Sequence, residues 1–136
     1  NKRTDAYLDV VEQAGLSALV REVEFVKPDD EKGAVVAKIL DENPDIDGIF
    51  AGDDTMAAIC LNVMKQRGLS APDDIKVVGA DGARRTMTFM PDLTTVRQDI
   101  DRIGELAAQS IIALINGDNP ESNIKLPVEL IEGKTA

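Results

Sequence analysis

Residues 75–99, IKVVGADGARRTMTFMPDLTTVRQD, carry the clearest strand and turn signals in the chain. This stretch begins with a short, β-branched apolar run, residues 75–80, that has the length of a buried strand. The run ends at Asp81-Gly82, a pair typical of a turn. After a basic, methionine-rich loop, a second short strand is expected at residues 93–96. Asp81 therefore follows the carboxyl end of a buried strand, where open α/β sheets bind their ligands, although it could instead only stabilise the turn.

The composition is that of one globular domain without a nucleic-acid surface. The chain has 136 residues, 43% of them apolar, which is enough for one core. Its formal net charge is −10, and it has no basic cluster. Binding to phosphates requires concentrated Lys and Arg. We therefore do not expect this part of the protein to contact DNA.

The residue inventory argues against catalysis and against a bound metal or cofactor. There is no histidine and only one cysteine, Cys60, so the chain has neither a disulfide framework nor the common zinc ligands. Cys60 lies in an apolar helical stretch and is expected to be a small buried side chain. Asp53 and Asp81 could form a carboxylate pair, but no nucleophile–base partner and no glycine-rich nucleotide motif accompanies them. We expect a binding protein rather than an enzyme.

No signal peptide or membrane-spanning stretch is present, so no membrane partner is expected. The chain starts at Asn1 without a methionine, and a helix with Arg3 in its first turn begins at once. In an α/β fold a strand should lead into such a helix. We therefore expect the chain to be part of a longer protein whose preceding strand is absent here.

Helices and strands are expected to alternate along the chain. The expected helices are residues 2–14, 28–43, 54–66 and 99–116, and the expected strands are residues 21–26, 46–51, 75–80, 93–96 and 124–131. This order predicts an α/β fold with a mainly parallel sheet flanked by helices. Pro127 predicts an edge position for the last strand.

Two of these helices carry extensive apolar surface. The helix at residues 54–66 is apolar nearly all round and should be buried on two sides. The helix at residues 99–116 carries a wide apolar stripe. Acidic residues should cap the helix starts: Asp29 or Asp30 for one helix, and Asp53 or Asp54 for the next, with Asp54 the favoured one.

Four motifs give the chain a family resemblance. They are AGDDTMA at residues 51–57, VVGAD at 77–81, PDLTTVRQD at 91–99 and LPVELIEGKT at 126–135. In this order and spacing they resemble the effector-binding domain of LacI/GalR-type transcriptional regulators, over essentially the whole chain. The resemblance implies a type I periplasmic-binding-protein-like fold, in which two α/β lobes enclose a cleft and the chain crosses between them three times.

The resemblance also implies how the chain is divided. Residues 1–97 would be the C-terminal lobe without its first strand. Residues 98–120 would form a helix that belongs to the absent N-terminal lobe, and residues 121–136 would return as a strand to the C-terminal lobe. The N-terminal lobe and a DNA-binding helix-turn-helix would lie outside this chain.

By the same resemblance, Arg3, Asp53 and Asp81 match positions that hydrogen-bond an effector. Ile100 matches a wall position of the cleft, and Gln98 lies beside it. Carboxylates accept hydrogen bonds from hydroxyls and a guanidinium donates from a rigid fork, which suits a sugar or sugar-like molecule.

Simpler roles stay open for two of these residues. Asp53 could be only a helix cap, and Arg3 could pair with Asp5 or Asp101. The chain also has Ala80 where the family usually has an aromatic residue, so the effector's identity is left open.

The expected function is effector sensing by a cytoplasmic, homodimeric transcriptional regulator. The small molecule would reorient the lobes and so change how the dimer presents its DNA-binding heads. We expect the dimer interface to contain the outer face of the helix at residues 54–66, with Cys60 and Met64. Met87, in the loop at residues 84–90, is expected to join them. The alternative is a periplasmic sugar-binding component of a transporter.

Overall fold

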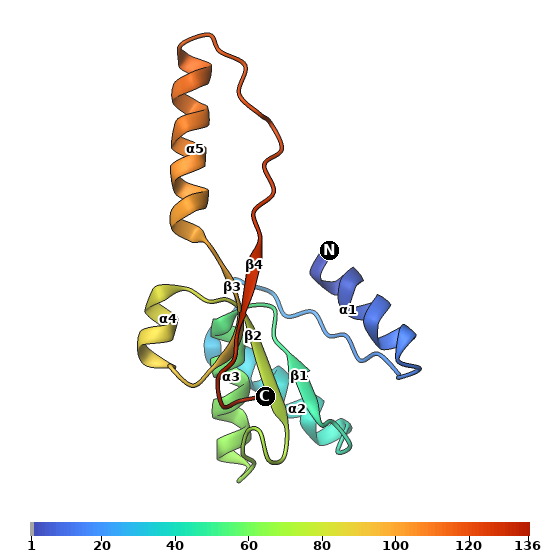
Figure 1. Ribbon diagram of the computed structural model, residues 1–136. Helices are drawn as coiled ribbons and strands as arrows, with labels where there is room; N and C mark the ends of the chain where they lie inside the picture. The colour runs from blue at the N-terminus through green and yellow to red at the C-terminus, as the bar shows by residue number, and fades with distance from the viewer. Residues whose placement is uncertain (1) are drawn as a thin grey trace. The chain divides into compact units, whose positions relative to one another are not determined.

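The computed structural model describes residues 2–136 (Figure 1). The chain divides into two compact units, Asn1–Pro44 and Asp45–Ala136. The first unit contains two helices, α1 (Lys2–Gln13) and α2 (Asp29–Glu42). Val36 and Leu40, one helical turn apart on α2, are buried. The ammonium of Lys32 lies 3.5 Å from a carboxylate oxygen of Asp29 and 5.5 Å from the centre of the Phe25 ring.

Two expectations for the first unit are wrong. Residues 21–26 form no strand: within the part of the chain that the structure describes, no neighbouring strand pairs with them, and Phe25 and Val26 are exposed. Alternating apolar residues are insufficient without a partner for the backbone hydrogen bonds. Neither Asp29 nor Asp30 caps α2; Pro28 holds the cap position, and the two acids lie in the first turn, where the helix dipole favours them.

The second unit is built on a four-stranded sheet in the order β1-β2-β3-β4. The strands are β1 (Gly48–Phe50), β2 (Lys76–Asp81), β3 (Thr94–Gln98) and β4 (Val128–Ile131). β1, β2 and β3 are parallel, and β4 runs antiparallel to β3. The expected α/β class with a mainly parallel sheet is therefore confirmed. β4 is an edge strand, as Pro127 predicts, but it starts only after that proline, which has no N–H to donate.

Three helices belong to the second unit: α3 (Asp54–Gln66), α4 (Arg84–Phe89) and α5 (Ile100–Ile115). α3 packs on β2, and the core includes Ala57, Met64, Val77 and Leu93, all almost fully buried. The segment expected as a methionine-rich loop is the helix α4, because the residues between Gly82 and Pro91 contain no helix-breaking residue.

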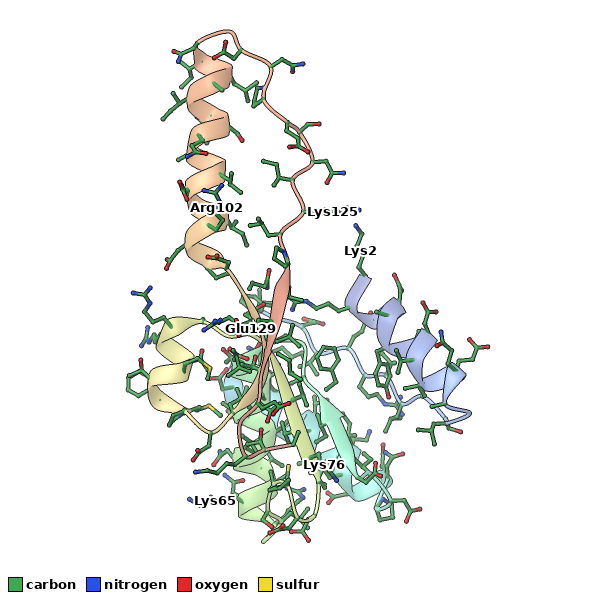
Figure 2. All side chains as sticks on the ribbon, in the orientation of Figure 1. Lys2, Lys65, Lys76, Arg102, Lys125 and Glu129 are labelled. Carbon is green, nitrogen blue, oxygen red and sulfur yellow. The ribbon has the colours of Figure 1, made fainter. Side chains whose placement is uncertain are left out.

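α5 extends away from the sheet, and the chain returns from its far end to β4 (Figure 1). Asp99 caps it by accepting a hydrogen bond from the Arg102 N–H at 2.9 Å. None of its residues is buried. Figure 2 shows Arg102 on α5 and Glu129 on β4, and the Glu129 carboxylate accepts a hydrogen bond from Arg97 of β3 at 2.5 Å. Among residues 2–136, no helix is long and apolar enough to span a membrane.

The C-terminal motif is fastened to the starts of β2 and β3. The Thr135 hydroxyl donates to the Val77 carbonyl at 2.7 Å and accepts from the Thr94 N–H at 3.0 Å. Gly133 passes so close to Asp92 that a Cβ at this position would lie 2.2 Å from the Asp92 carbonyl oxygen. These contacts hold β4 in the sheet although it is 30 residues beyond β3 in sequence order.

Candidate functional site

The carboxyl ends of β1, β2 and β3 lie along one edge of the sheet, because the three strands are parallel. β1 is followed by the start of α3 at Asp53, β2 ends at Asp81 and β3 ends at Gln98. Three of the five expected ligand residues therefore come to one edge of the second unit. Such an edge is the usual ligand position in open α/β sheets.

Asp81 and Gln98 contact each other directly. The Gln98 side-chain amide donates to Asp81 Oδ1 at 2.6 Å. Asp81 has φ 102, in the left-handed region that side-chain-bearing residues rarely adopt. The next residue, Gly82, has φ 60, and a Cβ there would lie 2.6 Å from the Arg97 Cβ. The turn packs closely against β3 and fixes the orientation of the Asp81 carboxylate. The unfavourable backbone conformation of Asp81 costs ~1–3 kcal/mol of folding free energy.

Asp53 is the N-cap of α3. Its backbone is extended, with φ −152 and ψ 173, and its Oδ1 accepts from the Met56 N–H at 2.7 Å. The capping interpretation is confirmed, and it is compatible with ligand binding. A carboxylate offers about four lone-pair sites, so a capping bond leaves room for a ligand hydroxyl.

Asp54 was expected to be the cap, and that expectation is wrong. It is the first residue of α3, only 3% exposed, and its Oδ1 accepts from the Thr95 hydroxyl at 2.5 Å. Among residues 2–136, its Oδ2 has no hydrogen-bond partner. The extended backbone of Asp53 gives that residue the cap position and turns Asp54 inward. The adjacent acids in the sequence indicate that one of them caps the helix, but local pattern does not identify which one.

Ile100 and Arg3 occupy different parts of the chain. Ile100 is the first residue of α5, two positions after Gln98, and is exposed. It therefore lies where an apolar wall beside the site would begin. Arg3 lies in α1 of the first unit and is exposed. Asp101 pairs with Arg84 of α4, at 2.9 Å between Nη2 and Oδ2.

The residues expected at a dimer interface differ in exposure. Cys60 and Met64 belong to the buried core, so their expected place on an outer face of α3 is wrong. Burial raises the pKa of the Cys60 thiol to about 11. The error arose because an all-round apolar helix does not reveal which side faces its own sheet. Met87, on α4, is half-buried.

The chemistry of this edge is that of hydrogen-bond recognition. Asp53 and Asp81 present carboxylate oxygens, and Gln98 presents an amide with both a donor and an acceptor. Within residues 2–136, no group of three or more acidic or cysteine side chains is arranged to hold a metal ion. A neutral ligand with several hydroxyls matches these groups, because each hydroxyl can donate to a carboxylate and accept from an amide.

The comparisons with known proteins place the chain in a family. The model of a family described as a periplasmic binding protein-like domain matches residues 1–136. The chain is 31% identical to the ribose operon repressor of Halalkalibacterium halodurans, over 98% of the chain and 40% of that protein. It is 33% identical to the sucrose operon repressor of Pediococcus pentosaceus, over 100% of the chain and 42% of that protein.

A solved structure of a related regulator has the same fold. A LacI family transcriptional regulator from Arthrobacter sp. FB24, in complex with lactose, superposes with a TM-score of 0.85 at 27% identity, over 99% of this chain and 50% of that one. The chain spans about two fifths of the length of the curated relatives that it matches. The resemblance carried by the four sequence motifs is confirmed. The chain belongs to the family of periplasmic binding protein-like domains, and its relatives named above are two sugar operon repressors and a LacI family transcriptional regulator.

Proposed function

We propose that this chain is the part of a DNA-binding transcriptional regulator that binds its effector, a small polyhydroxylated molecule such as a sugar or a sugar-like compound. The observation that carries the proposal is the meeting of Asp53, Asp81 and Gln98 at the carboxyl edge of three parallel strands. The names of the ribose and sucrose operon repressors and the lactose complex of a structural relative support this ligand class.

In this proposal each residue has a distinct role. Asp81, aimed by its turn and by Gln98, accepts hydrogen bonds from ligand hydroxyls. Asp53 accepts a further hydrogen bond from a ligand hydroxyl, because its bond to the Met56 N–H leaves other lone pairs of the carboxylate available. Ile100 supplies an apolar wall beside these groups. For Arg3, on α1 of the first unit, ligand binding stays a prediction.

We further propose that residues 1–97 form one lobe, residues 98–120 pack on another lobe outside this chain, and residues 121–136 return to the first. In the structure, β3 leads into α5 directly after Gln98, and β4 pairs with β3. A ligand at Gln98 would therefore touch the segments that cross between lobes. It would shift the lobe arrangement by its difference in affinity between the two states.

The partners follow from the same proposal. DNA would be bound by a helix-turn-helix outside this chain, which fits the net charge of −10 here. The regulator would be a cytoplasmic homodimer with no catalytic activity and no cofactor. The alternative, a periplasmic sugar-binding component of a transporter, would require a signal peptide in place of a helix-turn-helix, so the full-length N-terminus distinguishes the two.

Replacing Asp81 tests the proposed site. In the full-length protein, Asp81→Ala should weaken binding of sucrose, ribose or lactose by about 1.5–3 kcal/mol, the scale of hydrogen bonds to a charged group. Asp81→Gly should do the same without backbone strain, since glycine tolerates φ 102. Asp73→Ala, an exposed acid before the opposite end of β2, is the matched control. If calorimetry finds equal affinity for all three variants and the unmodified protein, Asp81 does not bind the ligand.

A further inference from the structure

A buried polar contact joins three elements beneath the candidate site. Asp54 at the start of α3 accepts a hydrogen bond from Thr95 of β3 at 2.5 Å, across 41 residues of sequence. Both residues are inaccessible, with Asp54 3% and Thr95 0% exposed. The contact therefore lies in the core and not on the ligand-facing surface.

The third element is β2, at Gly79. Gly79 is in register with Thr95, and a Cβ built on Gly79 would lie 2.5 Å from Asp54 Oδ1. The missing side chain thus leaves the space through which the Asp54 carboxylate reaches across β2 to β3. We call the contact of Asp54, Gly79 and Thr95 the clasp.

Each member of the clasp is a near neighbour of a proposed ligand residue. Asp54 directly follows Asp53, Gly79 precedes Asp81 by two positions, and Thr95 precedes Gln98 by three. Gly79 and Thr95 lie on strands, and Asp54 lies in the first turn of a helix. The distance from each clasp residue to its neighbouring ligand residue is therefore fixed by regular secondary structure. A movement of the clasp would therefore move the ligand-binding groups relative to one another.

The clasp is not what stability alone would select. Asp54 Oδ2 is buried and, within the described residues, has no hydrogen-bond partner, so the contact leaves one acceptor unsatisfied. Replacing a buried polar pair by apolar groups of similar volume is often neutral or stabilising. A polar pair here therefore suggests a requirement for geometry.

We propose that Asp54 and Thr95 are positioning residues for effector binding: their hydrogen bond over Gly79 fixes Asp53 of α3 relative to Asp81 and Gln98 at the ends of β2 and β3. This inference rests on the proposed function. It adds a pair of residues that do not touch the ligand and act through those that do.

The first test compares two substitutions of Thr95 in the full-length protein. Thr95→Val keeps the shape and removes the hydroxyl, whereas Thr95→Ser keeps the hydroxyl. Calorimetry with sucrose, ribose and lactose should show binding about threefold to tenfold weaker for Thr95→Val, the scale of one hydrogen bond, and near normal for Thr95→Ser. The control, Val77→Ala at the start of β2, should lower stability but not affinity. Equal affinity for Thr95→Val and Thr95→Ser would overturn the proposal.

The second test asks whether the clasp acts through Asp53. If it does, Thr95→Val should weaken binding less in an Asp53→Ala background than in the unmodified protein. Full, multiplicative losses would overturn the positioning role. Asp53→Ala without any effect on binding would count instead against the proposed site, so the two failures are distinguishable.

The third test needs no sugar. The Met56 N–H donates to the Asp53 carboxylate at 2.7 Å, so its hydrogen exchange reports how firmly Asp53 is placed. In Thr95→Val this amide should exchange several-fold faster, while in Thr95→Ser and Val77→Ala it should exchange as before, after correction for global stability. Unchanged exchange in Thr95→Val would overturn the clasp even if none of the three sugars binds.

Discussion

α3 and α5 have similarly apolar sequences and opposite environments in the second unit. α3 packs on β2 and buries five of its residues: Asp54, Ala57, Cys60, Val63 and Met64. α5 buries none, and it exposes six large apolar side chains: Ile100, Ile103, Ile111, Ile112, Leu114 and Ile115.

The difference shows what an apolar stripe on a helix indicates. It predicts that a face is to be covered, but it does not identify the covering element. For α3 the cover is a strand of the same unit. For α5 we propose that it is the other lobe, which lies outside this chain.

The largest effect is expected in α3. Met64 is 1% exposed, so Met64→Ala should lower the free energy of unfolding of the full-length protein by about 2–5 kcal/mol, from lost transfer energy and the cavity left behind. Lys65→Ala, on the exposed side of the same helix, is the control and should change it by less than about 0.5 kcal/mol. Urea unfolding measures both. A small effect of Met64→Ala would contradict the burial assigned to α3.

A smaller effect is expected for α5, and it depends on the length of the protein. In a polypeptide of only these 136 residues, the apolar face of α5 should cause self-association, because burying each such side chain is worth roughly 1.5–3 kcal/mol. Ile111→Asp should reduce the association that light scattering detects, and Gln109→Asp is a control on the same helix. This polypeptide should also bind sugars poorly. A monomer of the unsubstituted polypeptide with full affinity would show that the lobe division is wrong.

The smallest effect is expected at α4, where the side chain of interest is less buried than the core of α3 and less exposed than the apolar face of α5. Met87 is half-buried, and we still expect it at a two-fold contact, now without Cys60 or Met64. Met87→Glu in the full-length protein should weaken the dimer by about 1–2 kcal/mol, because a charge replaces a partly buried apolar group. Analytical ultracentrifugation at decreasing concentration measures it, with exposed Thr88→Glu as the control. Unchanged dissociation would place the interface elsewhere.

Three features of the folded chain differ from what its local sequence patterns predict. Residues 21–26 have the alternation of a strand but, among the described residues, no paired neighbour. Asp53 and Asp54 are chemically identical candidates for one cap, and the backbone conformation of Asp53 chose between them. Cys60 and Met64 were assigned to the wrong side of an all-round apolar helix. The inward contact of Asp54 is made with Thr95, 41 residues away, and the strand that covers α3 is also distant in sequence, so no local pattern encodes either.

The features that depend on local chemistry could be predicted from the residues alone: the order of most helices and strands, the turn at Asp81-Gly82, the edge position implied by Pro127, and acids at strand ends. The features that depend on contacts between distant segments became visible only in the folded chain. In the fold Gln98 pairs with Asp81, Asp54 turns into the core against Thr95, and no residue of α5 is buried. The physical reason is that capping, turn formation and periodicity act over a few residues, whereas burial and side-chain hydrogen bonds depend on which surfaces the folded chain brings together.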